Sequence, residues 1–224
     1  MKKLILICIL GTFLKITQAD LINDHIDDGA SHIINSEVYE NNSLILDSYI
    51  KNFPGTHVDV KNGAICGNIW AYNYSTVTVY DGLIGELNAM DNSCINIYGG
   101  SISPYSLRAW NSSVINLYGG NVGNLLSIRG DASINLYGSN FRVNGFGLSE
   151  GDKLSDYCEL IDGYYTGVIT GILSDGSCLN NTFKIFKSGD WEGIGDIYII
   201  PEPCSVALVG FGGLLVLWRG RCVG

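Results

Sequence analysis

The chain repeats one short phrase four times. The copies read TVTVYDGLI, CINIYGGSI, VINLYGGNV and SINLYGSNF, at residues 76–84, 94–102, 114–122 and 133–141. Steps of 18, 20 and 19 residues separate the shared tyrosines, which are Tyr80, Tyr98, Tyr118 and Tyr137. Aliphatic residues that alternate with polar ones predict strands, and a period near twenty is typical of a solenoid, in which each repeat buries its apolar face against the next.

Alignment on the tyrosines produces columns of like residues. Two aliphatic columns precede the tyrosine: Val77, Ile95, Ile115 and Ile134, then Val79, Ile97, Leu117 and Leu136. Strand side chains alternate between faces, so these columns face inward while the Thr/Asn and Tyr columns face outward. Further aliphatic columns lie upstream and downstream: Ile69, Leu87, Leu107 and Leu126; Ala71, Ala89, Ala109 and Ile128; Ile84, Ile102, Val122 and Phe141.

Turn residues separate the strands in every repeat. The pairs between the upstream strand and the repeated phrase are Asn73–Tyr74, Asp91–Asn92, Asn111–Ser112 and Gly130–Asp131. Further upstream, Val58, Val60 and Ile65 align with Val77, Val79 and Ile84, and Lys61 replaces the tyrosine. We therefore predict an all-β fold, a parallel β-helix (solenoid) of coils of about 19 residues over residues 20–144.

Residues 145–200 break the period and predict a C-terminal β cap. Strand-like runs at 164–173, 183–186 and 197–200 follow a Gly-rich loop, and Ser174-Asp175-Gly176-Ser177 predicts a tight turn. Such a segment would cover the open end of a solenoid, whose strand edges are otherwise unpaired. Cys158 and Cys178 flank this hairpin and are disulfide candidates if the protein is exported; buried free thiols are the alternative.

Composition and spacing argue against several functions. A net charge of −9 with only 13 Lys and Arg disfavours nucleic-acid binding. The three histidines lack zinc-site spacing, no Cys-x-x-Cys is present, and we expect no metal or cofactor. The outward columns offer no carboxylate pair of the kind that glycosidases use. We expect no catalysis, an expectation that would change if Asp81, Asp91 and Arg108 met in one cleft.

The two ends of the chain predict export. Residues 1–19 read as a signal peptide, with Lys2–Lys3, an apolar stretch and a cleavage site at Ala19. At the other end, Pro201-Glu202-Pro203 precedes an apolar run from Val206 to Trp218, followed by Arg219 and Arg221. A helix over this run would be about 20 Å long, short of the hydrocarbon core of about 30 Å.

Residues 201–224 resemble the PEP-CTERM sorting signal of exported bacterial proteins, in the tripeptide, the apolar run and the two arginines. The resemblance implies recognition by an exosortase-type membrane protease, transient or permanent membrane anchoring, and a place in the cell envelope or extracellular matrix near polysaccharide. The short apolar run, the adjacent Cys204 and the trailing Cys222-Val223-Gly224 depart from the pattern.

The expected function is that of an exported, non-catalytic surface or matrix protein with a structural or adhesive solenoid. One alternative is a polysaccharide-binding module in which the four tyrosines, helped by Trp110, form an outward aromatic platform. A β-helix carbohydrate-active enzyme is the other alternative. Repetition of an aromatic column alone does not separate a self-supporting ladder from a sugar platform.

Overall fold

The structure is a computed structural model that describes residues 24–26, 28–35, 38–46, 55–103, 107–123, 125–187 and 193–200. The predicted signal peptide (residues 1–19) and sorting tail (residues 201–224) lie outside these ranges. The described residues form an all-β protein of nineteen strands in one mixed sheet, which confirms that the fold is all-β. They contain no helix with the length and apolarity that a membrane crossing requires.

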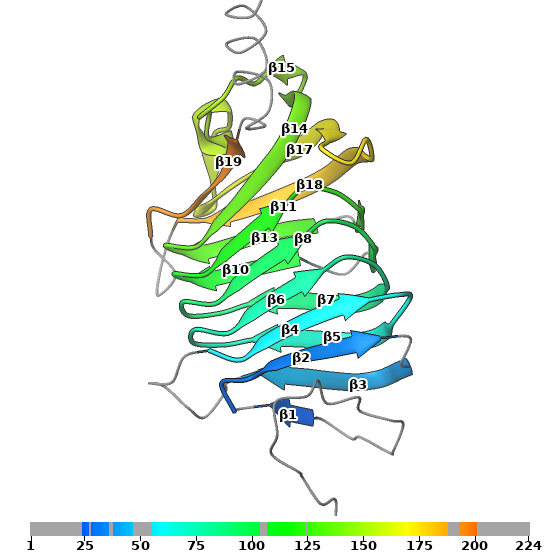
Figure 1. Ribbon diagram of the computed structural model, residues 1–224. Coiled ribbons are helices and arrows are strands. Elements are labelled where there is room, and N and C mark those ends of the chain that lie inside the picture. The colour runs from blue at the N-terminus through cyan, green and yellow to red at the C-terminus, as the bar shows by residue number, and fades with distance from the viewer. Residues whose placement is uncertain are drawn as a thin grey trace, which may run out of the picture.

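Parallel strand pairs dominate this sheet and form two ladders, which Figure 1 shows stacked in chain order. The first ladder contains, in order, β2 (Ser31–Asn35), β4 (His57–Lys61), β6 (Thr76–Val79), β8 (Cys94–Ile97), β11 (Val114–Leu117), β14 (Ser133–Val143) and β19 (Asp196–Ile200). The second contains β1 (Asp24–Ile26), β3 (Val38–Leu46), β5 (Ile65–Ala71), β7 (Leu83–Ala89), β10 (Leu107–Asn111), β13 (Leu125–Gly130) and β18 (Cys178–Phe186). Two short strands, β9 (Ser101–Ile102) and β12 (Asn121–Val122), extend a parallel pairing with β7.

The register pairs the residues that the sequence alignment placed in columns. Ile95 lies opposite both Val77 and Ile115, and Ile115 lies opposite Ile134. All four side chains are fully buried, as are their neighbours two residues on. The upstream columns pair in the same way, and Leu87, Leu107 and Leu126 are also buried. The predicted inward face is therefore the core, because only that face removes the aliphatic side chains from water.

One predicted alignment is wrong by a single residue. Ile65 was expected opposite Ile84, but the structure pairs Ile84 with Cys66 and pairs Ile65 with Leu83. Cys66 is buried at 2% exposure, whereas Leu83 is 48% exposed. A shift of one residue exchanges the two faces of a strand, so Cys66 takes the inward position that the alignment gave to Ile65.

Left-handed residues join the two ladders within each repeat. The first member of each predicted turn pair has a positive φ: Asn73 at 51°, Asp91 at 57°, Asn111 at 60° and Gly130 at 69°. Asn, Asp and Gly are the residue types that adopt this conformation at low cost. A buried serine follows two of these turns, where the Oγ of Ser93 accepts from Met90 N–H and that of Ser113 from Trp110 N–H.

The C-terminal segment, residues 145–200, adds an antiparallel hairpin and then rejoins both ladders. Strand β17 (Tyr164–Leu173) pairs antiparallel with β14 on one side and with β18 on the other. Strands β18 and β19 then pair in parallel with β13 and β14. The predicted strands and the turn at residues 174–177 are confirmed, with β18 beginning earlier, at Cys178. The segment also holds β15 (Phe146–Gly147), β16 (Leu160–Ile161) and a short 3-10 helix, η1 (Leu154–Tyr157).

Candidate functional site

The four repeated tyrosines form a continuous stack on the outer side of the first ladder. Their ring centroids are 5.6 Å apart between Tyr80 and Tyr98, 4.6 Å between Tyr98 and Tyr118, and 4.0 Å between Tyr118 and Tyr137. The angles between successive ring planes are 13°, 10° and 20°. The spacing follows from the strands, because neighbouring strands lie about 4.8 Å apart. The rings therefore lie face against face.

Both ends of this stack have a neighbour. The Lys61 ammonium lies 4.8 Å from the centre of the Tyr80 ring, and an ion pair with Asp59, 2.7 Å long, holds it there. At the other end the register places Ile200 beside Tyr137. Tyr80 and Tyr98 keep 47% and 45% of their surface exposed, and the two later tyrosines are half-buried. Because the faces are occupied, solvent reaches these rings mainly at their edges and hydroxyl groups.

A ladder of asparagine amides runs parallel to the tyrosines, two residues earlier in each strand. Asn116 Nδ2 donates to Asn96 Oδ1 at 2.9 Å, and Asn135 Nδ2 donates to Asn116 Oδ1 at 2.8 Å. The central amide, Asn116, thus accepts through its carbonyl from one neighbour and donates through its NH₂ to the other. Such a chain satisfies polar groups that are partly removed from water and fixes the register of three strands.

The surroundings of Tyr118 favour the neutral form of its side chain. Burial, followed by hydrogen bonding to Tyr137 and Tyr98, raises the pKa of Tyr118 well above its ordinary value. A phenolate at that position would lose solvation and would face neighbouring hydroxyl groups in a poorly hydrated site. Tyr118 is therefore neutral at physiological pH.

Trp110, the fifth predicted platform residue, does not join the tyrosines. It lies on β10 of the second ladder, where the Arg129 guanidinium is 4.8 Å from the centre of its ring. The same guanidinium lies 4.4 Å from the Phe186 ring, so Arg129 is enclosed between two aromatic side chains. Burial, and then the nearby Arg108, lowers the pKa of Arg129. Sequence columns could not reveal this cluster, because Phe186 belongs to the inserted hairpin.

The predicted disulfide between Cys158 and Cys178 is absent, and both residues are free thiols. Cys158 lies against the Asn144 amide, and the Asn144 N–H in turn donates to Val168 O. Cys178 lies opposite Ile172, which is four residues after Val168 on β17. Four residues of strand span about 13 Å, too far for two cysteines to bridge. Burial raises the pKa of the Cys158 thiol, which makes it a weaker nucleophile.

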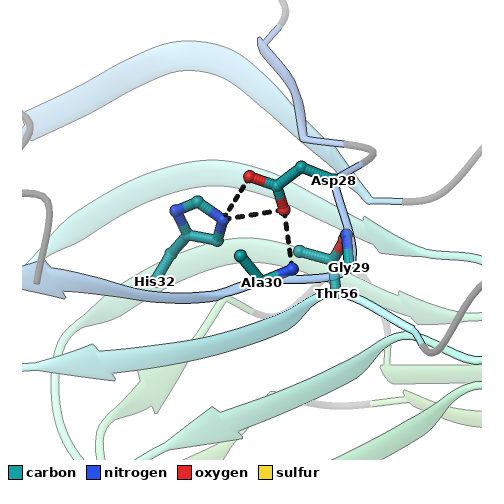
Figure 2. Close-up of polar contacts among 5 residues, drawn as sticks. All are labelled: Asp28, Gly29, Ala30, His32 and Thr56. Carbon is teal, nitrogen blue, oxygen red and sulfur yellow. Dashed lines mark hydrogen bonds and ion pairs between the residues drawn. The ribbon is translucent and has the colours of Figure 1, made fainter. Parts of the chain in front are cut away.

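Two of the three histidines, His32 and His57, have carboxylate partners. Figure 2 shows His32 Nε2 facing both oxygens of Asp28, each at 3.0 Å, while Asp28 Oδ1 also accepts from Ala30 N–H. Burial alone would raise the pKa of Asp28, but these bonds outweigh it and the pKa is lowered. His57 pairs with Asp59 in the same way at 3.0 Å. The first pair joins β2 to the residues just before it, and the second lies within β4.

The charged residues that were considered for catalysis have separate partners. Asp91 accepts from Asn111 Nδ2 at 2.8 Å, and Arg108 faces Glu86 at 3.8 Å. Asp81 accepts from the N–H of the next residue, Gly82. Across the described ranges, no group of three or more His, Cys, Asp or Glu side chains is arranged to hold a metal ion.

Comparison with known proteins yields no relative. No protein-family model matches the chain, and no curated protein or solved structure matches it either. The predicted sorting residues, Pro201, Glu202, Pro203, Arg219 and Arg221, lie outside the described residues. The site must therefore be interpreted from its own geometry.

Proposed function

We propose that the protein is an exported, non-catalytic structural or adhesive protein whose ectodomain is a parallel β-helix. Support for the β-helix comes from the parallel pairing of strands one repeat apart and from the inward aliphatic columns. Like side chains repeated along the ladders stabilise each pairing by about 0.2–1 kcal/mol. A stack of this kind provides a rigid rod with regular outer faces.

The observation that carries this proposal is the closed tyrosine stack. A sugar ring that binds to an aromatic platform needs an open ring face. Here each inner face meets a neighbouring tyrosine, and Lys61 covers the outer face of Tyr80. The arrangement serves cohesion between strands better than it serves a stacked ligand, so we assign the tyrosines a structural role.

A double substitution, Tyr98→Ser with Tyr118→Ser, tests this role. We expect a clearly lower melting temperature, because all three stacked tyrosine pairs are lost. Tyr74→Ser is the matched control, since Tyr74 is 54% exposed in a turn outside the stack. Unchanged melting together with lost retention on immobilised polysaccharide would overturn the structural assignment and favour the binding-module alternative.

Export and sorting rest on the sequence alone. The signal peptide and the resemblance of residues 201–224 to PEP-CTERM tails support delivery to the cell envelope or matrix, through an exosortase-type protease and with membrane attachment by the C-terminus. Cell fractionation combined with mass spectrometry of the mature C-terminus tests this. A cytosolic protein that retains residues 1–19 and 201–224 would contradict it.

A further inference from the structure

A groove of about 420 Å³ has none of the four stacked tyrosines in its lining. It is bounded by the corner strands β9 and β12 and by the start of β18. Its volume falls within the range of about 300–1,000 Å³ that is usual for small-ligand sites. The proposed structural role does not use this groove.

The groove presents uncharged polar side chains that have no partner of their own. Ser101, Ser103, Asn121 and Asn180 line it, and within the described ranges none of their side chains makes a hydrogen bond. Hydroxyl and amide groups can each donate and accept. No charged residue is among the described residues that line the groove.

Apolar surface lies beside these polar groups. Leu83 is 48% exposed and pairs with Ser101, which in turn pairs with Asn121. These three outward residues therefore form a row across three strands, about 10 Å long at the usual strand spacing. The row offers an aliphatic surface at one end and an amide at the other.

The floor of the groove is fixed. Asn181 is 3% exposed, and its Nδ2 donates to the carbonyl of Val122 at 3.2 Å and to that of Gly123. The neighbouring corner is held by Asp175 Oδ2, which accepts from Gly120 N–H at 2.8 Å. Because side chains of the protein already use these backbone groups, they are not available to pair with an incoming peptide strand.

We propose that this groove binds a neutral, hydroxyl-rich ligand, namely a short stretch of uncharged saccharide. Donor-acceptor side chains match sugar hydroxyls, the aliphatic end matches the C–H face of a sugar ring, and the lack of cations disfavours uronates and phosphates. The site is independent of the tyrosine stack, so either assignment can fail alone.

Alkylation of Cys178 provides the test, because this exposed thiol lines the groove. The full chain is treated with N-ethylmaleimide, and modification of Cys178 is followed by peptide mass spectrometry. The probes are maltotriose, cellotriose and chitotriose, with trigalacturonate and a Gly-Ser hexapeptide for comparison. We expect at least one neutral trisaccharide to slow the reaction at least about threefold, and the uronate and the peptide to leave it unchanged.

Substitutions in the groove separate this site from others. Asn180→Leu and Asn121→Leu should each lower the affinity for the protecting trisaccharide by about threefold to tenfold, the range expected for the loss of one hydrogen bond. Asn92→Leu, at an exposed turn, is the matched control and should have no effect. The proposal is overturned if no neutral trisaccharide protects Cys178, if the uronate or peptide protects it equally, or if folded Asn180→Leu and Asn121→Leu proteins retain full affinity.

Discussion

The repeats and the C-terminal segment complete the same two ladders by different means. In the repeats, each strand pairs with the strand one repeat away, and like side chains meet: Ile with Ile, Asn with Asn, Tyr with Tyr. In the C-terminal segment, β18 and β19 reach their partners only after a hairpin has intervened. Unlike groups meet where this segment joins the repeats, as where Phe186 of β18 contacts Arg129 of β13.

This difference indicates two sources of stability. The repeats gain theirs from many small and equivalent contacts, so that no single pair dominates. The C-terminal segment depends on a few specific anchors. Phe183 is buried in the core, Asp175 accepts a hydrogen bond from Gly120 N–H, and Asn181 donates to the carbonyls of Val122 and Gly123. Loss of one anchor should therefore act locally.

The largest effect is expected from Phe183→Ala. Phe183 is fully buried and lies opposite Leu126. Truncation of a buried Phe lowers the free energy of unfolding by about 3–5 kcal/mol. We expect early proteolytic cleavage within residues 145–200, whereas Ile115→Ala in the repeats should lower the urea midpoint of the whole chain. Cleavage patterns that do not differ between the two variants would mean that the regions unfold as one unit.

Gly100→Ala and Gly176→Ala compare the corners of the two regions. Both glycines have positive φ, 87° and 88°, and a non-glycine residue there costs about 1–2 kcal/mol. A Cβ on Gly100 would also lie 3.0 Å from the carbonyl oxygen of Gly82, while one on Gly176 would meet no atom within 4 Å. Gly100→Ala should therefore lower the melting temperature more. Equal shifts in melting temperature for the two variants would show that the backbone around Gly100 can move enough to accommodate a Cβ atom.

Asp175→Ala removes the anchor at the hairpin tip. The Asp175 carboxylate accepts from the N–H groups of Gly120 and Ser177, both at 2.8 Å. Its loss should reduce stability by about 1–3 kcal/mol. Hydrogen exchange should increase in β17 and β18 while β8 and β11 stay protected. Glu150→Ala, at an exposed turn, serves as the control. Faster exchange throughout β8 and β11 would refute a local anchor.

The smallest effect concerns the tyrosine stack at alkaline pH. Because the pKa of Tyr118 is raised in the fold above its ordinary value of 10.0, the unfolded chain releases this proton first. The contribution of this pKa shift to the free energy of unfolding is complete below about pH 10. It is lost as pH rises toward the folded-state pKa of Tyr118, since the unfolded state then binds fewer protons than the folded state. Urea unfolding at increasing pH should show a shallower decline for Tyr118→Phe. Identical slopes for the two proteins would contradict it.

The amino-acid sequence by itself determined the regular part of the molecule. Its period gave the inward columns, the left-handed turn residues such as Asn73 and Asp91, and the turn at Asp175-Gly176, because equivalent residues one repeat apart meet the same neighbours. Local chemistry and alternation are sufficient for these features. Two features escaped. One is the shift at Cys66, since one extra residue leaves the composition of a column almost unchanged. The other is the end of the fourth repeat, where β14 continues through Phe141 and pairs antiparallel with β17 instead of in parallel with β12.

Tertiary structure decided what depends on contacts across the insertion or on side-chain orientation. It left Cys158 and Cys178 as free thiols, placed Phe186 against Arg129, closed the faces of the tyrosine rings and formed the groove beside Asn180. Residues far apart in the chain meet there only after the core at Phe183 has closed, so no period in the sequence records them. Orientation matters equally, because a column of tyrosines has the same sequence whether its rings stack or splay apart.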